Sequence, residues 1–375
     1  MRIRITKNIQ YGNVCDVSVR SSKNQAEVSF SASPQGGPES LWFCFRITAI
    51  NKIKRIKIVL KHPYNMLMGG CELSNILPVI RKDKGNWQRI ERNYEFLALP
   101  DGRYEISWIL NNPGKINEIS LCYPYGAPEI ETLVKESKGY WKKDTIGVST
   151  ENRPMIRLSN DYSFPDSKKP GIYIVARQHS GETPGSLVLD GFLRYLSEIR
   201  NKESIVWAVP LVNIDGIEKG YYGKDNYPID VNRAWGNPSM RHETLVIQRD
   251  INRWKERCTP ILGIDFHAPG GAQGDGIYFF LQKEKSAFMN KERSLINIIE
   301  KKIGKTYMAK QCAVVAQYRE RWNGLTFSQY CRKYINIPGL CVEIPYAFCG
   351  KNLLTQKKYQ EIGKKIACAI IETLK

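Results

Sequence analysis

Residues 172–186 read Ile-Tyr-Ile-Val-Ala-Arg-Gln-His-Ser-Gly-Glu-Thr-Pro-Gly-Ser, and they pass from an apolar run into a polar, glycine-containing turn. The apolar run predicts a buried strand, and the pattern from Ser186 onward predicts a helix. His179 and Glu182 therefore lie three residues apart on the turn that follows a strand. Zinc accepts such nitrogen and oxygen ligands at about 2 Å, and a catalytic site needs three protein ligands and an open position. The chain must then supply a third ligand.

The pattern around this stretch predicts an α/β fold. Apolar strands alternate with amphipathic helices from residue 124 onward. The expected strands are 171–176, 205–212, 261–266, 277–281 and 340–344, and the expected helices lie near 185–200, 239–257, 286–303 and 354–374. Continuous apolar strands separated by helices indicate a mixed, mostly parallel sheet with helices on both faces. Ligands bind such sheets at the carboxyl ends of the strands.

Two more polar side chains follow apolar strands at that edge. His267 ends the run Gly-Ile-Asp-Phe-His, and Glu343 ends the run Leu-Cys-Val-Glu. The chain has four histidines, and His62 and His242 are expected to be structural or surface residues. His267 is therefore predicted to be the third zinc ligand, although a strand-end histidine can also be purely structural. Glu343 suits a general base and acid, and the alternative is a structural pair with an arginine.

Residues 230–233 read Asp-Val-Asn-Arg and suggest supporting roles. Arg233, together with Asn232, can hold a carboxylate through charged hydrogen-bond donors. Asp230 can bind the distal nitrogen of a zinc-bound histidine and fix its tautomer. Asp265 is a second candidate for the same supporting role.

Residues 1–123 predict a separate all-β domain. Short alternating runs at 26–30, 41–47, 55–60, 103–109 and 116–122 are separated by clusters of Gly, Pro, Asn and Asp. Period-2 alternation with regular turn signals favours an antiparallel sandwich. We therefore expect two domains, a sandwich at 1–123 and a catalytic domain at 124–375.

Composition narrows the class of protein. At 42% hydrophobic and 25% charged residues, the chain is typical of a globular protein, and no apolar run is long enough for a transmembrane helix. The first residues lack the apolar stretch of a secretory signal, and the ten cysteines form no Cys-x-x-Cys motif, so a cytoplasmic location is expected. The net charge of +19 is spread along the chain without a nucleic-acid-binding motif. We therefore expect neither a nucleic-acid nor a membrane partner.

The ordered set His-x-x-Glu, Asn-x-Asp-Gly, Asp-x-Asn-Arg, strand-His and strand-Glu resembles the zinc metallocarboxypeptidases. The run Ala-Arg-Gln-His-Ser-Gly-Glu at 176–182 is similar to the cytosolic carboxypeptidase subfamily, which includes tubulin deglutamylases and bacterial relatives. The resemblance covers 124–375 by motif and 1–123 by architecture. It implies one zinc per chain bound by His179, Glu182 and His267, with Glu343 as general base and acid. It also implies that Asn232 and Arg233 grip the terminal carboxylate of a peptide.

Several positions depart from the subfamily pattern. Ile214 stands where the family usually has Pro, and the loop 268–275 differs from the His-Gly-His-Ser type. Subfamily members tend to carry an Arg near Gly223 that stabilises the transition state. Here Lys224 is the adjacent cation. The tyrosine that closes the pocket in this family corresponds to either Tyr318 or Tyr330.

The leading hypothesis is a zinc-dependent metallocarboxypeptidase that removes a C-terminal residue through a peptide or isopeptide bond. The basic composition favours an acidic residue at that position. A zinc-dependent N-acyl amino acid amidase or a cell-wall peptide peptidase would use the same motifs. A binding protein with a degenerate site is a further alternative, which the retained ligands and Glu343 disfavour.

Overall fold

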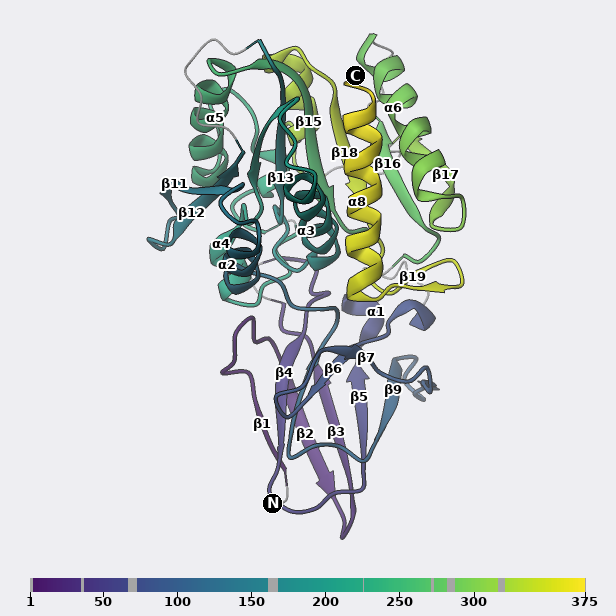
Figure 1. Cartoon of the computed structure of the whole chain (residues 1–375). Coiled ribbons are helices and arrows are strands. Elements are labelled where there is room, and N and C mark those ends of the chain that lie inside the picture. The colour runs from purple at the N-terminus through teal and green to yellow at the C-terminus, as the bar shows by residue number, and fades with distance from the viewer. Residues whose placement is uncertain are drawn as a thin grey trace.

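The computed structural model describes residues 3–34, 37–66, 73–160, 168–224, 226–270, 273–281, 287–315 and 321–374. Two five-stranded sheets form from the first 120 residues, and an eight-stranded sheet with its helices follows (Figure 1). The predicted fold class is confirmed by this arrangement. No helix of the described ranges is both long and apolar enough to cross a membrane.

The two N-terminal sheets face each other, and we call residues 3–120 the N-terminal sandwich. One sheet has the order β1 (Ile3–Thr6), β4 (Cys44–Ala49), β10 (Ile116–Ser120), β6 (Val79–Lys82) and β7 (Gln88–Arg89). The other has the order β2 (Cys15–Ser21), β3 (Gln25–Ser31), β5 (Arg55–Lys61), β9 (Tyr104–Asn111) and β8 (Glu95–Ala98). Phe30 of β3 packs on Phe45 of β4 with ring centroids 4.6 Å apart, so aromatic side chains join the sheets. The sandwich is not wholly antiparallel, because β3 and β5 run parallel.

The large sheet has the order β11 (Lys142–Val148), β12 (Pro154–Ser159), β14 (Ile205–Val209), β13 (Pro170–Ala176), β15 (Thr259–His267), β18 (Gly339–Glu343), β16 (Ile277–Leu281) and β17 (Met308–Val315). The four central strands run parallel, as predicted. The sequence analysis did not predict β11, β12 and β17, and β16 runs antiparallel to β18. These outer strands are short or partly exposed, so their hydrophobic signal is weak.

Helices cover both faces of this sheet (Figure 1). The helix α3 (Thr183–Glu198) packs on one face, where Phe192 meets Phe266 of β15, and it also contacts α8 (Gln356–Glu372). The helix α5 (His242–Lys255) covers the other face, where Trp254 meets Tyr173 of β13. The remaining helical segments are α1 (Pro63–Met66), α2 (Ala127–Glu136), α4 (Ile214–Glu218), α6 (Ala287–Ile303), α7 (Phe327–Tyr330), the 3-10 turns Leu73–Asn75 and Val231–Arg233, and the π-helical turn Cys331–Ile335. A short hairpin joins β19 (Phe348–Cys349) to β20 (Asn352–Leu353).

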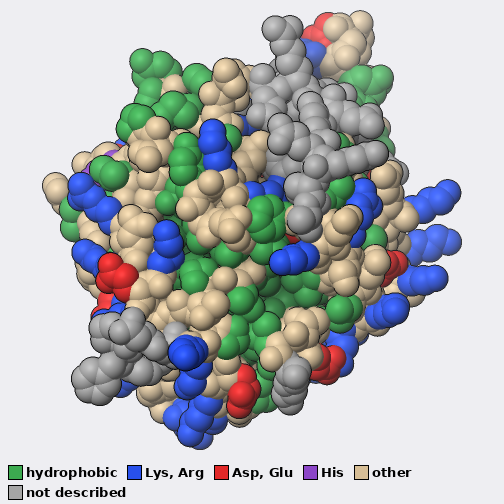
Figure 2. All heavy atoms as spheres, turned by 90° about the horizontal axis from the view of Figure 1, so that it is seen from above, with side chains coloured by type: hydrophobic (Ala, Val, Ile, Leu, Met, Phe, Trp, Pro, Cys, Tyr) green, Lys and Arg blue, Asp and Glu red, His purple; other side chains and the backbone are tan. Residues whose placement is uncertain are grey.

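The sandwich lies against the carboxyl-end loops of the large sheet (Figure 1). Asn13 donates to the carbonyl of Gly220 at 2.8 Å, and Trp42 packs beside Gly181 of the turn after β13. The opposite end of the molecule carries Lys and Arg side chains scattered over the visible face, with few acidic ones among them (Figure 2). The carboxyl-end edge of the large sheet, where ligands are expected to bind, therefore faces the sandwich.

Candidate metal centre

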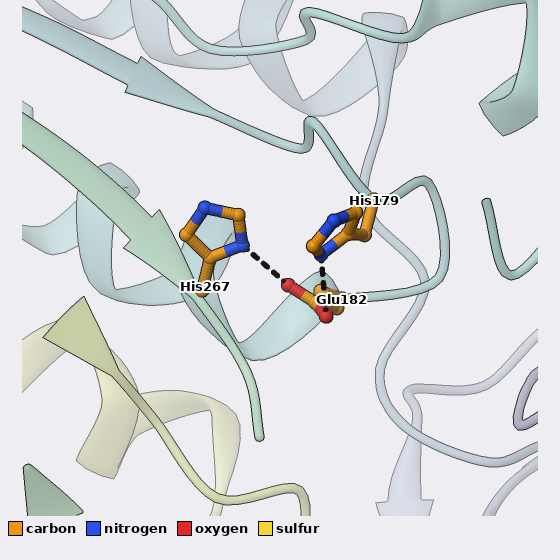
Figure 3. A group of neighbouring side chains, drawn as sticks. All are labelled: His179, Glu182 and His267. Atoms are coloured by element: carbon orange, nitrogen blue, oxygen red, sulfur yellow. Dashed lines mark hydrogen bonds and ion pairs between the residues drawn. The ribbon is translucent and has the colours of Figure 1, made fainter. Parts of the chain in front are cut away.

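The structure brings together three side chains from two neighbouring strands of the large sheet. His179 and Glu182 lie on the turn between β13 and α3, and His267 is the last residue of β15. The two imidazole rings flank the carboxylate of Glu182 (Figure 3). All three are buried, and their donor atoms lie within 4.8 Å of one another.

Each histidine presents the same ring nitrogen to Glu182. Nδ1 of His179 lies 2.9 Å from Oε1, and Nδ1 of His267 lies 2.8 Å from Oε2. The outer nitrogens contact two other carboxylates. Nε2 of His179 lies 3.1 Å from Asp230 Oδ1, and Nε2 of His267 lies 2.7 Å from Asp265 Oδ2. A proton on each Nε2 satisfies those carboxylates and leaves each Nδ1 with a lone pair for a metal.

The buried carboxylates around the two histidines favour a positive charge at this site. Burial alone would lower the pKa of His179, but the carboxylates of Glu182 and Asp230 outweigh it and raise that pKa to about 9. The pKa of His267 is also raised, against burial, by Asp265 and Glu182. A buried cluster of carboxylates holds protons on imidazoles when nothing else neutralises it. A divalent ion bound at the two Nδ1 atoms would supply this positive charge, so the donor set fits a metal.

A second group that could hold a metal among the described residues consists of Asp265, His267 and Cys341. It shares His267 with the first group, and there Asp265 already occupies the outer nitrogen of the ring. The first group is therefore the better candidate.

Glu343 ends β18 and lies in register with His267 on the neighbouring strand. Side chains in register on adjacent strands point to the same face of the sheet, so Glu343 faces the metal centre. It is 8% exposed, and its Oε2 has no hydrogen-bond partner within the described part of the chain. Burial raises the pKa of Glu343 to about 7. The structural pairing with an arginine, the alternative considered above, is not seen among the described residues.

The three residues expected to bind substrate, Asn232, Arg233 and Lys224, differ in burial and in their contacts. Asn232 is buried, and its Oδ1 accepts from the backbone N–H of Phe327 at 3.0 Å and from Gln178 at 3.1 Å. These contacts hold the side chain against Gln178 and Phe327. The binding of a substrate carboxylate by Asn232 stays a prediction. Arg233 is half-buried and donates to the carbonyl of Asn232. Lys224 is half-buried, and its charge acts on Glu343 to lower the pKa of that carboxyl.

An arginine could not replace Gly223 without a change in the loop. Its φ is +82°, and a Cβ there would lie 2.6 Å from both N and Oγ of Ser180, which belongs to the ligand turn. Only glycine adopts this conformation without strain and allows such a close approach. The neighbouring residue, Lys224, is the cation whose charge acts on Glu343.

Of the two candidate pocket-closing tyrosines, Tyr318 lies outside the described residues. Tyr330 ends α7 and is buried, with its ring 5.6 Å from that of Trp235. The other two histidines are as expected, because His242 is exposed and bonds the carbonyl of Val148, and His62 lies just after β5.

The sequence analysis missed residues that shape the ligand turn. Arg177 is 2% exposed, and its guanidinium donates to the carbonyls of Ser180 and Tyr125. It holds the turn in place from inside. A charged residue at the end of an apolar run, two residues before a predicted ligand, is a signal that could have drawn attention to it.

The N-terminal sandwich also reaches the site. A Cβ on Gly181 would lie 2.7 Å from the ring of Tyr222 and 3.1 Å from Trp42, so the ligand turn is wedged between them. Glu39 pairs with Arg321 at 3.4 Å, and both Glu39 and Lys224 approach Gly270, three residues after His267. The sandwich therefore packs directly against the segments that carry the candidate ligands.

The motif Asn-x-Asp-Gly at 213–216 has a structural role here. Asn213 caps α4 by accepting from the N–H of Gly216, and Asp215 accepts from Ser149, Thr150 and Arg153. These contacts fasten the loop after β14 to the edge of the sheet.

The fold and the three converging donors are those expected of a metal-dependent hydrolase of the carboxypeptidase type. Residues 128–309 match the zinc carboxypeptidase family of M14 peptidases. This part of the chain is a zinc carboxypeptidase domain, the kind of domain that defines the class of metallocarboxypeptidases.

The relatives and structural neighbours agree with this class. Cytosolic carboxypeptidase 6 of Mus musculus is 24% identical over 371 residues, which cover 88% of this chain and 66% of the mouse protein. The Homo sapiens protein of the same name is 24% identical and covered to 71%. The chain thus spans about two thirds of the length of these relatives.

Among solved structures, the metallo-carboxypeptidase from Burkholderia cenocepacia superposes with a TM-score of 0.77 at 16% identity, covering 99% of this chain and 98% of the other. The metallo-carboxypeptidase from Pseudomonas aeruginosa superposes with a TM-score of 0.73 at 15% identity, covering 99% of this chain and all of the other. Both matches extend over the sandwich and the large sheet, so the two-part architecture is shared.

Proposed function

We propose that this protein is a zinc-dependent metallocarboxypeptidase that hydrolyses the C-terminal peptide or isopeptide bond of a peptide or protein. The observation that carries the proposal is the convergence of His179 Nδ1, His267 Nδ1 and the Glu182 carboxylate, with each outer ring nitrogen on an aspartate. These three residues would hold one zinc ion. Bound zinc acidifies water and polarises a carbonyl oxygen.

The remaining chemistry belongs to the side chains. Glu343 would take a proton from the attacking water and deliver it to the leaving amine, since its Oε2 has no other partner among the described residues. Arg233 would bind the free carboxylate of the substrate with its charged donors. Asp230 and Asp265 would keep the protons of both histidines on Nε2.

Lys224 would stabilise the negative charge that develops on the carbonyl oxygen. We expect Lys224→Met to lower kcat by about 10²-fold or more, as loss of an oxyanion donor does elsewhere. Lys219→Met is the matched control, because Lys219 lies in the same segment but is paired with Glu151 at the surface. Steady-state kinetics on a peptide with a free C-terminus measures the effect. Equal kcat for the two variants would remove Lys224 from the mechanism.

We further propose a preference for acidic C-terminal residues. The net charge of +19, the cation Lys224 near Glu343 and the cation Arg233 near Asp230 favour an anionic side chain. Peptides ending in Glu, Lys and Leu, each with a free and an amidated C-terminus, test both ideas. The highest kcat/KM is expected for the free Glu peptide, and a preference for Lys or Leu would refute the acidic preference.

The same assay distinguishes the peptidase from an amidase. We expect one zinc per chain by elemental analysis, and we expect activity to be lost on chelation and restored by zinc. We also expect release from peptides rather than from N-acyl amino acids. Stoichiometric zinc with hydrolysis of N-acyl amino acids alone would establish the amidase instead. A chain that takes up no zinc would overturn the ligand set.

A further inference from the structure

Gln178 lies directly before the ligand His179 and is fully buried. Its side chain, however, contacts Asp265 and Asn232, which lie beside the other histidine of the site, His267. Its Oε1 accepts from the indole N–H of Trp235 at 2.6 Å. Its Nε2 donates to Asp265 Oδ2 at 2.6 Å and to Asn232 Oδ1 at 3.1 Å. We propose that Gln178 is a positioning residue that, through Asp265, sets the tautomer and orientation of His267.

The partners of Gln178 determine which way its amide points. The indole of Trp235 can only donate, so the oxygen of the amide must face it. The nitrogen then faces Asp265, whose Oδ2 accepts its hydrogen bond. A reversed amide would place two donors together at Trp235 and two acceptors together at Asp265. The observed orientation is therefore the one that satisfies both ends.

Asp265 depends on this contact. Its Oδ2 receives hydrogen bonds from Gln178 at 2.6 Å and from Nε2 of His267 at 2.7 Å. Its Oδ1 is buried and has no hydrogen-bond partner in the described part of the chain. One oxygen therefore carries all the hydrogen bonds that hold this carboxylate against His267. Without Gln178, Asp265 would lose the partner that fixes its direction.

Asn232 completes the arrangement. Its Nδ2 lies 3.0 Å from Nε2 of His267, but a protonated Nε2 cannot accept from it, so the charged and shorter contact with Asp265 decides the tautomer. The Asn232 amide is in turn held at Oδ1 by Gln178 and by the N–H of Phe327. Gln178 thus restrains both groups that touch the outer nitrogen of His267.

This inference rests on the proposed zinc site, and its test measures zinc affinity rather than turnover. Competition with a chromophoric chelator at fixed pH gives the zinc dissociation constant of the full chain. We expect Gln178→Leu to weaken zinc binding by about 10-fold to 100-fold, the range typical of residues that hold a metal ligand in place. Gln360→Leu is the matched control, because the amide of Gln360 also donates to a carboxylate, that of Asp190, at 2.8 Å. Gln360 lies on α8 and is not one of the residues of the candidate metal centre.

A second pair of variants separates positioning from folding. Trp235→Phe removes the indole N–H together with part of a buried ring, but leaves the contact between Gln178 and Asp265, and should weaken zinc binding less than Gln178→Leu does. Gln178→Glu sets a carboxylate against Asp265, and its defect relative to wild type should shrink as the pH falls and the introduced carboxyl becomes protonated. Thermal unfolding of the metal-free chains shows how far each change affects stability alone.

The outcomes are distinguishable from failure of the proposed function. A wild-type chain without zinc affinity would refute the metal site itself. Wild-type affinity in Gln178→Leu and Gln178→Glu, or an equal loss in Gln360→Leu, would refute the role of Gln178 while leaving the metal site intact.

Discussion

Glu343→Gln is expected to lower kcat/KM for release of a C-terminal residue by about 10³-fold, while the zinc content stays at one per chain. General acid–base groups contribute 10²-fold to 10⁴-fold in rate, and a glutamine amide can neither take up nor deliver the proton. Glu343 lies in register with His267, and its Oε2 has no hydrogen-bond partner among the residues that the structure describes, so its loss should spare the ligands. Peptide hydrolysis and elemental analysis on the same preparation measure both quantities.

The control for this change is Glu118→Gln. Glu118 is also a buried carboxylate, but it lies in β10 of the sandwich and pairs with Arg46 and Arg81. That variant should lose stability and keep its kcat/KM. Wild-type kcat/KM in Glu343→Gln would assign the proton transfer to another residue, and loss of zinc would show that Glu343 supports the metal instead.

Arg89→Met is expected to lower the free energy of unfolding by about 3–5 kcal/mol. Arg89 lies in β7 of the sandwich and is half-buried, and its guanidinium donates to the buried backbone carbonyls of Leu77, Leu121, Tyr346 and Leu354. Each buried carbonyl left without a donor costs about 1–3 kcal/mol. Tyr346 and Leu354 belong to the segment after Glu343, so the same side chain joins the sandwich to the catalytic sheet.

Urea unfolding measures this loss, and Arg103→Met provides the comparison. Arg103 is an exposed arginine whose partner, Asp101, is also exposed, so its removal should change the stability little. Since whole proteins are stable by about 5–15 kcal/mol, the Arg89 variant should unfold at a clearly lower urea concentration. Equal midpoints for the two variants would show that the carbonyls find other donors.

Much of the catalytic half could be predicted from local pattern. His179, Glu182, His267 and Glu343 each follow an apolar strand, and parallel strands bring their carboxyl ends to one edge. Asp230 and Asp265 were inferred as partners of the ligand histidines from their short spacing to other site residues, and the structure has each on an Nε2 atom. Edge strands such as β17 were missed because half-exposed strands lack a continuous apolar run.

Other features depended on contacts between residues far apart in the chain. Trp235 lies 57 residues from Gln178, and Tyr346 lies 257 residues from Arg89, so no sequence spacing connects them. The wedging of Gly181 between Tyr222 and Trp42 likewise requires the sandwich to be docked on the sheet. Buried polar groups find their partners only when the strands and loops have packed.

The sequence by itself determined the class of fold and the residues that converge at the strand ends, because hydrophobic period and strand direction are local properties. The tertiary structure alone decided which atoms of those residues meet, how Gln178 and Arg177 hold them, and that the N-terminal sandwich forms part of the site. The reason is that a buried amide or guanidinium must satisfy every donor and acceptor it has, and its partners come from whichever segments folding brings within reach.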